Sequence, residues 1–190
     1  TASGPFLAAP PADFHDGPLM HKRGALHIGT SDQTPMADNM RAEFAASGVQ
    51  IDVSDRVAVA ARVPGLRSEW THGLWEPDCC DIDVAHLHAA YLRQAKRQGA
   101  VLHCNSRLSA AVWRKGAWQI AAGGLNCSAN ILINAAGAWA DEVAQMAQVR
   151  PLGIQPYRRT IAQLVVSPVV PADLPLVIGL DGSFYFKPDA

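Results

Sequence analysis

The sequence predicts an α+β protein, in which helix-to-strand units are combined with antiparallel strands. Three patterns support this prediction. Residues 83–99 predict an amphipathic helix, and the apolar run at 100–104 directly after it predicts a buried strand. A strand–turn–strand pattern occupies residues 108–121. A second apolar run, at 131–134, leads into three small residues and then into a further helix.

The N-terminal third contains three shorter signals. Residues 24–29 are apolar and predict a strand. Residues 36–47 carry an apolar stripe at helical spacing, and Gly48 ends it. Ser54 is in position to cap a short helix, which ends before Pro64 because proline cannot continue a helix.

The middle of the chain has the clearest start and stop signals. Asp83 is the expected N-cap of the helix that ends at Gly99. The two strands of the hairpin are followed by a Gly-Gly turn and a short strand at 125–128, and the last helix is expected at 138–147.

The C-terminal part predicts strands separated by a loop. Residues 157–166 predict a long strand, and three prolines between 168 and 175 predict a loop. Residues 183–187 predict a further strand, in which Phe184 and Phe186 share one face and Tyr185 points to the other.

Composition excludes several classes of partner. A formal net charge of -1 argues against a general nucleic-acid or anionic-membrane binder, which would carry a basic surplus. No apolar run approaches the roughly 20 residues that cross a bilayer, and the N-terminus does not resemble a signal peptide. Of the four cysteines, Cys79 and Cys80 are adjacent. A strained vicinal disulfide is one interpretation, and reduced thiols in a cytoplasmic protein are the favoured one.

Metal binding is not expected. His86 and His88 are two residues apart on the predicted helix, so they point in different directions, unlike an i, i+4 zinc pair. The cysteines lack the two closely spaced pairs of a structural zinc site.

The junction at 131–141 is the sharpest functional signal. Tiny side chains at Ala135, Ala136 and Gly137 would let a ligand approach the backbone, and the N–H groups at the following helix start suit an anion such as a pyrophosphate. The alternative is that small residues only let the helix and the strand pack tightly.

The motif NAAGAW at 134–139, with the acidic DID at 81–83 ahead of the predicted helix, resembles the middle of the D-amino acid oxidase and glycine/sarcosine oxidase family of FAD-dependent oxidoreductases. The resemblance runs from about Gly73 to Tyr185. It includes GAVLHC, PLGIQPYRR and SFYFKP in the family's order.

The resemblance implies a cofactor, FAD, and roles for particular residues. Ala135, Ala136, Gly137 and Trp139 would line the flavin near its pyrophosphate and ribityl chain. Leu108 stands where the family usually has a valine whose backbone meets the adenine. For Tyr185 the resemblance implies contact with the substrate, and the alternative is a tyrosine that serves its own strand. Arg158 and Arg159 replace an Arg-Gly-Gln of relatives, which puts a substrate role for them in doubt.

The resemblance also predicts what this chain lacks. No G-x-G-x-x-G motif occurs, although a dinucleotide-binding unit of this family carries one at its N-terminus. We therefore expect an internal fragment: a partial FAD-binding α/β layer at 73–147, packed with a mixed, largely antiparallel substrate-domain sheet from 1–72 and 148–190. The missing parts of the same parent protein would be its partners, and the chain alone is expected to be inactive.

The implied function is FAD-dependent oxidation of a small-molecule amine or amino acid, with hydride passing from the C–N carbon to the flavin. Two alternatives stay open at this point. One is an FAD-dependent dehydrogenase of the glycerol-3-phosphate type. The other is a non-enzymatic binding or scaffold domain.

Overall fold

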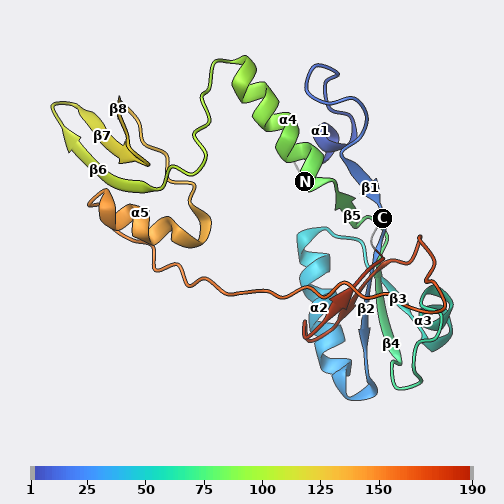
Figure 1. Ribbon diagram of the computed structural model, residues 1–190. Helices are drawn as coiled ribbons and strands as arrows, with labels where there is room; N and C mark the ends of the chain where they lie inside the picture. Colours follow the sequence, from blue (N-terminus) through green and yellow to red (C-terminus); the bar gives the residue numbers. More distant parts are fainter. Residues whose placement is uncertain (1–2, 189–190) are drawn as a thin grey trace. The chain divides into compact units, whose positions relative to one another are not determined.

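The computed structural model describes residues 3–188, which belong to two compact units. Unit 1 comprises residues 1–98 together with 165–190, and unit 2 comprises residues 99–164. Figure 1 labels the elements of both. The functional segments expected from the sequence, 1–72, 73–147 and 148–190, stay a prediction.

A five-stranded mixed sheet forms the centre of unit 1. Strand β9 pairs parallel to β2, whereas the pairs β2–β4, β3–β4 and β10–β9 are antiparallel. The sheet therefore confirms the mixed, largely antiparallel arrangement. Its strands, in spatial order, are β10 (Tyr185–Phe186), β9 (Leu176–Gly179), β2 (Ala25–Gly29), β4 (His72–Glu76) and β3 (Asp52–Ser54).

Helices cover both faces of this sheet, and the core of unit 1 lies beneath them. Val59 of α3 (Arg56–Arg62) packs with Leu26 and Val177 on one face. Ala37 of α2 (Thr34–Ser47) packs with Leu74 on the other face. Leu26, Val59 and Val177 are fully buried, so this sheet has a core that the unit itself supplies.

Two helix predictions meet different outcomes here. Gly48 ends α2 in the left-handed conformation, as expected. The cap predicted at Ser54 is wrong. Asp55 caps α3 by accepting a hydrogen bond from the Ala58 N–H at 2.8 Å, because Ser54 is held one residue earlier as the last residue of β3.

A glycine is required where β2 begins. Gly24 has φ +77°, and a Cβ there would lie 1.9 Å from the Trp75 ring. The Gly24 N–H donates a hydrogen bond to the Cys79 carbonyl at 2.9 Å, and this bond holds the backbone just ahead of β2 in place. Any side chain at this position would displace the Trp75 ring.

The remaining elements of unit 1 form a separate small layer. The strands β1 (Met20–Lys22) and β5 (Cys80–Ile82) pair antiparallel. Helix α4 (Val84–Arg97) follows β5 and starts at Asp83, whose carboxylate accepts from the His86 N–H at 2.9 Å, as the sequence predicted. A short helix, α1 (Gly4–Ala8), lies near the N-terminus.

Unit 2 contains an antiparallel meander and a helix. The meander confirms the predicted hairpin and the strand after it, and its strands are β6 (Leu108–Arg114), β7 (Ala117–Ala122) and β8 (Leu125–Ala129). The 3₁₀ helix η2 (Gly137–Trp139) leads into α5 (Ala140–Met146), which matches the predicted helix apart from its first turn. Arg107, before β6, pairs with Glu142 of α5 at 3.3 Å.

Three predicted strands are absent from the described residues. Segments 100–104, 131–134 and 157–166 are irregular and mostly exposed. Val101 and Ile133 are 76% and 81% exposed, although both were expected to be buried. A buried strand needs neighbouring strands along its edges, and these segments belong to none of the sheets formed by the described residues.

Across residues 3–188, no helix combines the length and the apolar character needed to cross a membrane.

Candidate functional site

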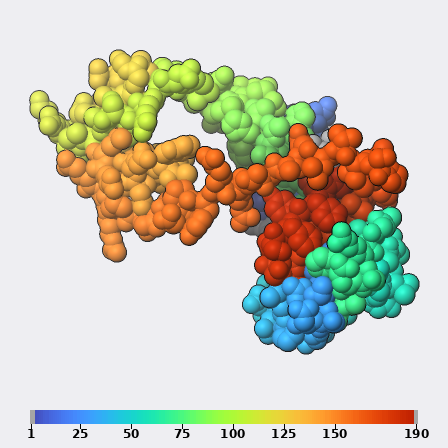
Figure 2. Space-filling model, turned by 60° about the horizontal axis from the view of Figure 1, so that its bottom comes forward, coloured from blue at the N-terminus to red at the C-terminus, as the bar shows by residue number. Residues whose placement is uncertain are grey.

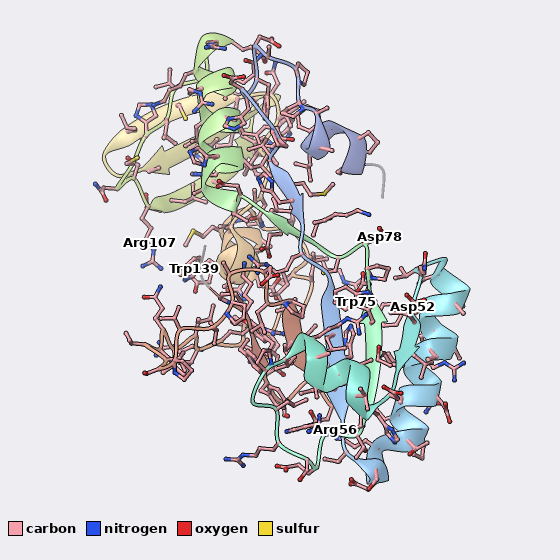
Figure 3. All side chains as sticks on the ribbon, turned by 90° about the vertical axis from the view of Figure 1, so that its right-hand side faces the viewer. Asp52, Arg56, Trp75, Asp78, Arg107 and Trp139 are labelled. Carbon is pink, nitrogen blue, oxygen red and sulfur yellow. The ribbon has the colours of Figure 1, made fainter. Side chains whose placement is uncertain are left out.

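The expected cofactor residues form one continuous stretch in unit 2. Ala135 and Gly137 are exposed, Ala136 is half-buried, and the side chain of Trp139, labelled in Figure 3, is 63% exposed. Leu108 belongs to the same unit and begins β6, where it is half-buried. Ala135, Gly137 and Trp139 are thus accessible to a ligand, whereas Ala136 and Leu108 are partly covered.

The side chain of Asn134 holds the junction in shape. Its Oδ1 accepts a hydrogen bond from the Ala136 N–H at 3.2 Å, and its Nδ2 donates to the Ala140 carbonyl at 2.8 Å. The oxygen and the nitrogen of the Asn134 side chain therefore both form hydrogen bonds across the turn at 135–137. Gly137 adopts φ +55°, and a Cβ built on it would meet no atom within 4 Å, so its surroundings are open.

Asp141 ties a second segment to the start of α5. Its carboxylate accepts from three successive backbone N–H groups, those of Leu152 at 3.0 Å, Gly153 at 2.9 Å and Ile154 at 2.8 Å. Hydrogen bonds from neutral donors to a carboxylate are among the stronger ones in proteins. The PLGI segment is consequently held beside the junction, a link that the sequence analysis missed.

These observations fit the FAD that the resemblance implies. The turn at 135–137 has only hydrogen atoms or methyl groups as side chains, and the Asn134 amide bonds across it through the Ala136 N–H and the Ala140 carbonyl. Such a surface allows close approach of a ligand to the main chain. Ala135, Ala136, Gly137 and Trp139 are the residues of unit 2 that would hold it.

Tyr185 lies in unit 1, on the edge strand β10. Its neighbours Phe184 and Phe186 stack with ring centroids 6.3 Å apart, and Phe184 also contacts the Trp70 ring and the core. Tyr185 is 50% exposed and pairs in register with Ile178. The alternation expected along this strand is therefore present, with the phenol on the side away from the two phenylalanines.

Two further residues share the sheet face of Tyr185. Ile178 is in register with His27 across the parallel pair, and residues directly opposite one another lie on one face. His27 is 7% exposed, and neither ring nitrogen has a hydrogen-bond partner among the described residues. Burial lowers the pKa of His27. Its Nε2 lies 3.9 Å from Glu76 Oε2, and the pKa of Glu76 is raised by burial and by the charge of Asp78.

A charged cluster surrounds the end of β10. Asp81 of β5 accepts from Lys187 Nζ at 2.9 Å through one carboxylate oxygen and from Arg23 Nε through the other. Burial raises the pKa of Asp81, but the hydrogen bonds and charges of Arg23 and Lys187 outweigh burial, and the pKa lies below its usual value. The sequence analysis missed this cluster. Its one signal was a lysine in the otherwise apolar SFYFKP.

Chain segments far apart in sequence meet at this cluster. Arg23 Nη1 donates to the Leu174 carbonyl at 2.9 Å and to the Ala172 carbonyl at 3.4 Å. The C-terminal segment, red in Figure 2, thus belongs to the same unit as the first residues of β2. Arg158 and Arg159 lie in the exposed, irregular part of unit 2.

The chain is similar to several known oxidoreductases. Human mitochondrial dimethylglycine dehydrogenase is 29% identical over 118 residues, which are 60% of this chain and 14% of that protein. Glycine oxidase from Geobacillus kaustophilus superposes with a TM-score of 0.74 at 16% identity, over 100% of this chain and 50% of that one. L-alpha-glycerophosphate oxidase from Mycoplasma pneumoniae, solved with FAD bound, gives 0.63 at 15% identity over 85% of this chain and 44% of that one.

These solved structures share the fold, and this chain spans half or less of their length. The description of the FAD dependent oxidoreductase family, DAO, matches residues 8–190, nearly the whole chain. The small-residue turn, the mixed sheet and this match lead to one conclusion: the chain belongs to the FAD dependent oxidoreductase family.

Proposed function

We propose that these residues serve the FAD-dependent oxidation of an amine or amino acid in a longer flavoprotein of the cytoplasm. The observation that carries the proposal is the family match over residues 8–190, joined to relatives named dimethylglycine dehydrogenase and glycine oxidase. The flavin would accept the hydride from the C–N carbon. The residues of this chain hold the cofactor and orient the substrate.

Each unit supplies a different part of this function. In unit 2, the turn at 135–137 and the Trp139 ring would contact the flavin, and Leu108 would contact its adenine end. In unit 1, Tyr185 would donate a hydrogen bond to the substrate, while its ring excludes water. No residue of the chain is assigned to proton transfer. The functional segments 1–72 and 148–190 on the substrate side and 73–147 on the flavin side are part of this proposal.

A second candidate is oxidation of a glycerol phosphate, which the likeness to L-alpha-glycerophosphate oxidase supports. The two candidates differ in the substrate's charged group and in the bond that is oxidised. They can therefore be separated by substrate.

The test is spectroscopic and kinetic. We expect the full-length protein to purify with the flavin absorbance bands and to reduce its flavin anaerobically with an amino acid or a methylated glycine. The 190-residue chain alone is expected to be colourless, because it has no G-x-G-x-x-G motif to bind the pyrophosphate. Flavin reduction by glycerol 3-phosphate and by no amine would favour the second candidate. A full-length protein without flavin would refute both.

A further inference from the structure

The hairpin of β6 and β7 in unit 2 (Figure 1) ends in two tryptophans and two cations. Trp113 and Trp118 are directly opposite one another in the register of the two strands, and their rings meet edge to face with centroids 5.5 Å apart. Trp113 is 53% exposed, and Trp118 is half-buried. Arg114 and Lys115 follow Trp113 directly, and both are exposed. We call these four residues the hairpin tip.

The backbone of the hairpin tip is a tight two-residue turn. Lys115 and Gly116 have φ of +54° and +78°, and a positive φ at both central residues is typical of the type I′ turns that suit the twist of a hairpin. Asn, Asp and Gly are usual at such positions, and other residues seldom adopt a positive φ. Lys115 thus stands where a less strained residue would fit, and it places a positive charge in the turn itself.

No carboxylate neutralises the two cations of the hairpin tip. The ion pair in the described part of unit 2 joins Arg107 to Glu142, and it leaves Arg114 and Lys115 without a carboxylate partner there. Residues 99–164 contain six lysines and arginines against two aspartates and glutamates, whereas the rest of the chain contains 10 against 15. The formal net charge of -1 therefore combines a basic unit 2 with an acidic unit 1.

The cofactor does not account for these cations. Leu108, which we propose to contact the adenine, begins β6, and Arg114 ends it. Six steps along an extended strand span about 20 Å, which is much longer than a lysine or arginine side chain. The hairpin tip therefore lies away from the adenine end of the cofactor, and its charges are free for another partner.

We propose that the hairpin tip binds the surface of an anionic phospholipid membrane, with the indole rings among the headgroups and the two cations against lipid phosphates. Tryptophan favours this position because its ring is apolar and its N–H donates a hydrogen bond. Lysine and arginine are attracted to an anionic surface. A nucleic acid would need a wider basic surface than two cations. The inference goes beyond the proposed function, and its failure would leave that function untouched.

The experiment measures co-sedimentation of the full-length protein with vesicles. The vesicles consist of phosphatidylcholine alone or of an equal mixture of phosphatidylcholine and phosphatidylglycerol. The variants are Lys115→Asn, Arg114→Gln, Trp113→Ala and Trp113→Phe, and the matched control is Lys96→Gln, at an exposed lysine of α4. Lys115→Asn removes the charge and introduces a residue that the turn favours. Flavin content and urea unfolding are compared with wild type, so that lost binding is distinguished from lost folding.

We expect wild type to bind the anionic vesicles about tenfold or more tightly than the neutral ones, and to bind them less as salt screens the charges. Lys115→Asn and Arg114→Gln should each lower the partition coefficient about fivefold. Trp113→Ala should lower it as well, Trp113→Phe should restore most of the binding because an aromatic ring remains, and Lys96→Gln should match wild type. Brominated lipid should quench tryptophan fluorescence more in wild type than in Trp113→Phe.

Three outcomes would overturn the inference. The first is a wild-type protein that stays in solution with both kinds of vesicle at low salt, as expected if another segment of the full-length protein covers the hairpin tip. The second is equal binding to both kinds of vesicle, or binding that neither Lys115→Asn nor Trp113→Ala changes. The third is tighter binding to a duplex DNA oligonucleotide than to anionic vesicles, with the same dependence on Lys115, which would assign this surface to nucleic acid.

Discussion

The sheet of unit 1 buries Leu26, Ile28 and Val177 to 1% exposure or less, whereas Ala111 and Ala144 are the buried residues in the described part of unit 2. Unit 1 therefore gains the free energy of apolar burial within itself. Unit 2 leaves large apolar side chains exposed, Trp139 and Ile133 among them. The cofactor residues expected from the sequence lie in the unit with less core of its own.

This difference shows how the two candidate regions, one in each unit, are held in shape. Around Tyr185, packing and an ion cluster fix the strand. Around Gly137, the Asn134 side chain holds the turn through two hydrogen bonds to the main chain, and Asp141 holds residues 152–154 next to α5 through three more. A turn held by polar groups remains open to a ligand, and an apolar core would close it.

The largest effect is expected in the core of unit 1. Leu26→Ala should reduce the free energy of unfolding by about 2–5 kcal/mol, because it removes a fully buried side chain and leaves a cavity. Urea unfolding measures this change. Val53→Ala, at a side chain that is 65% exposed in the same sheet, is the control and should cost less than about 1 kcal/mol. Equal costs would show that the described core is not the stabilising one.

The next prediction concerns Ile133, an exposed apolar residue of unit 2. In the 190-residue chain, Ile133→Ala should change the free energy of unfolding by less than about 0.5 kcal/mol, because the side chain is 81% exposed. In the full-length protein we expect a loss of about 2 kcal/mol or more, as for a buried isoleucine. The same small change in both proteins would mean that no other segment of the full-length protein covers the Ile133 side chain.

Ala136 tests the flavin side of the site. Ala136→Val should weaken FAD binding to the full-length protein at least tenfold, about 1.4 kcal/mol, because a branched side chain would stand where the cofactor approaches. Fluorescence titration of the apoprotein with FAD gives the dissociation constant. Ala147→Val, just after α5 in the same unit, is the matched control.

Gly137→Val should act in the same direction, although its φ of +55° adds backbone strain of its own. Unchanged FAD affinity in both Ala136→Val and Gly137→Val would favour the tight-packing alternative for the small residues.

Tyr185 tests the substrate side. Tyr185→Phe should lower kcat/KM for the best amine or amino-acid substrate about threefold to tenfold, because it removes one hydrogen-bond donor. Tyr91→Phe, at an exposed tyrosine of α4, is the control and should have no effect. A change within about twofold, under roughly 0.5 kcal/mol, would mean that the Tyr185 hydroxyl has no substrate role.

The smallest effect concerns pH. Burial holds the pKa of His27 below 6.5, so the unfolded chain takes up a proton below that pH before the folded chain does. The free energy of unfolding should therefore decrease as the pH falls from about 7.5 to 5.5, and the raised pKa of Glu76 acts in the opposite direction at lower pH. His27→Leu should show a flatter dependence in urea unfolding at the two pH values. An unchanged slope would assign the acid sensitivity to other groups.

Local signals predicted the elements that depend on neighbours in the sequence. The Asp83 cap, the Gly48 stop and the meander after Leu108 are set by hydrogen bonds over a few residues, and all are present. The strands at 100–104 and 131–134 depend on partners from elsewhere in a sheet, so their apolar character alone could not place them. β4 and β9 were missed for the same reason, since their pairing with β2 joins residues distant in sequence.

The residues of the candidate site likewise differ in whether neighbours in the sequence could reveal them. The resemblance pointed to Ala135, Ala136, Gly137 and Trp139, because they form one continuous motif. The resemblance did not predict the cluster of Asp81, Arg23 and Lys187, because folding brings these residues together from three separate segments. The roles of Leu108, Trp139 and Tyr185 stay predictions until the variants are measured.

Each unit contains two of the four cysteines, and these can be labelled chemically. All four are free thiols; Cys79 and Cys80 belong to unit 1, and the exposed Cys104 and Cys127 belong to unit 2. Burial raises the pKa of the Cys79 thiol, which lowers its thiolate fraction and slows its reaction with maleimides, and both Cys79 and Cys80 are partly covered. Cys104 and Cys127 should therefore accept a fluorophore first. Because Cys104 ends one of the exposed apolar segments, its labelling rate in longer proteins would report directly on whether that segment has been covered.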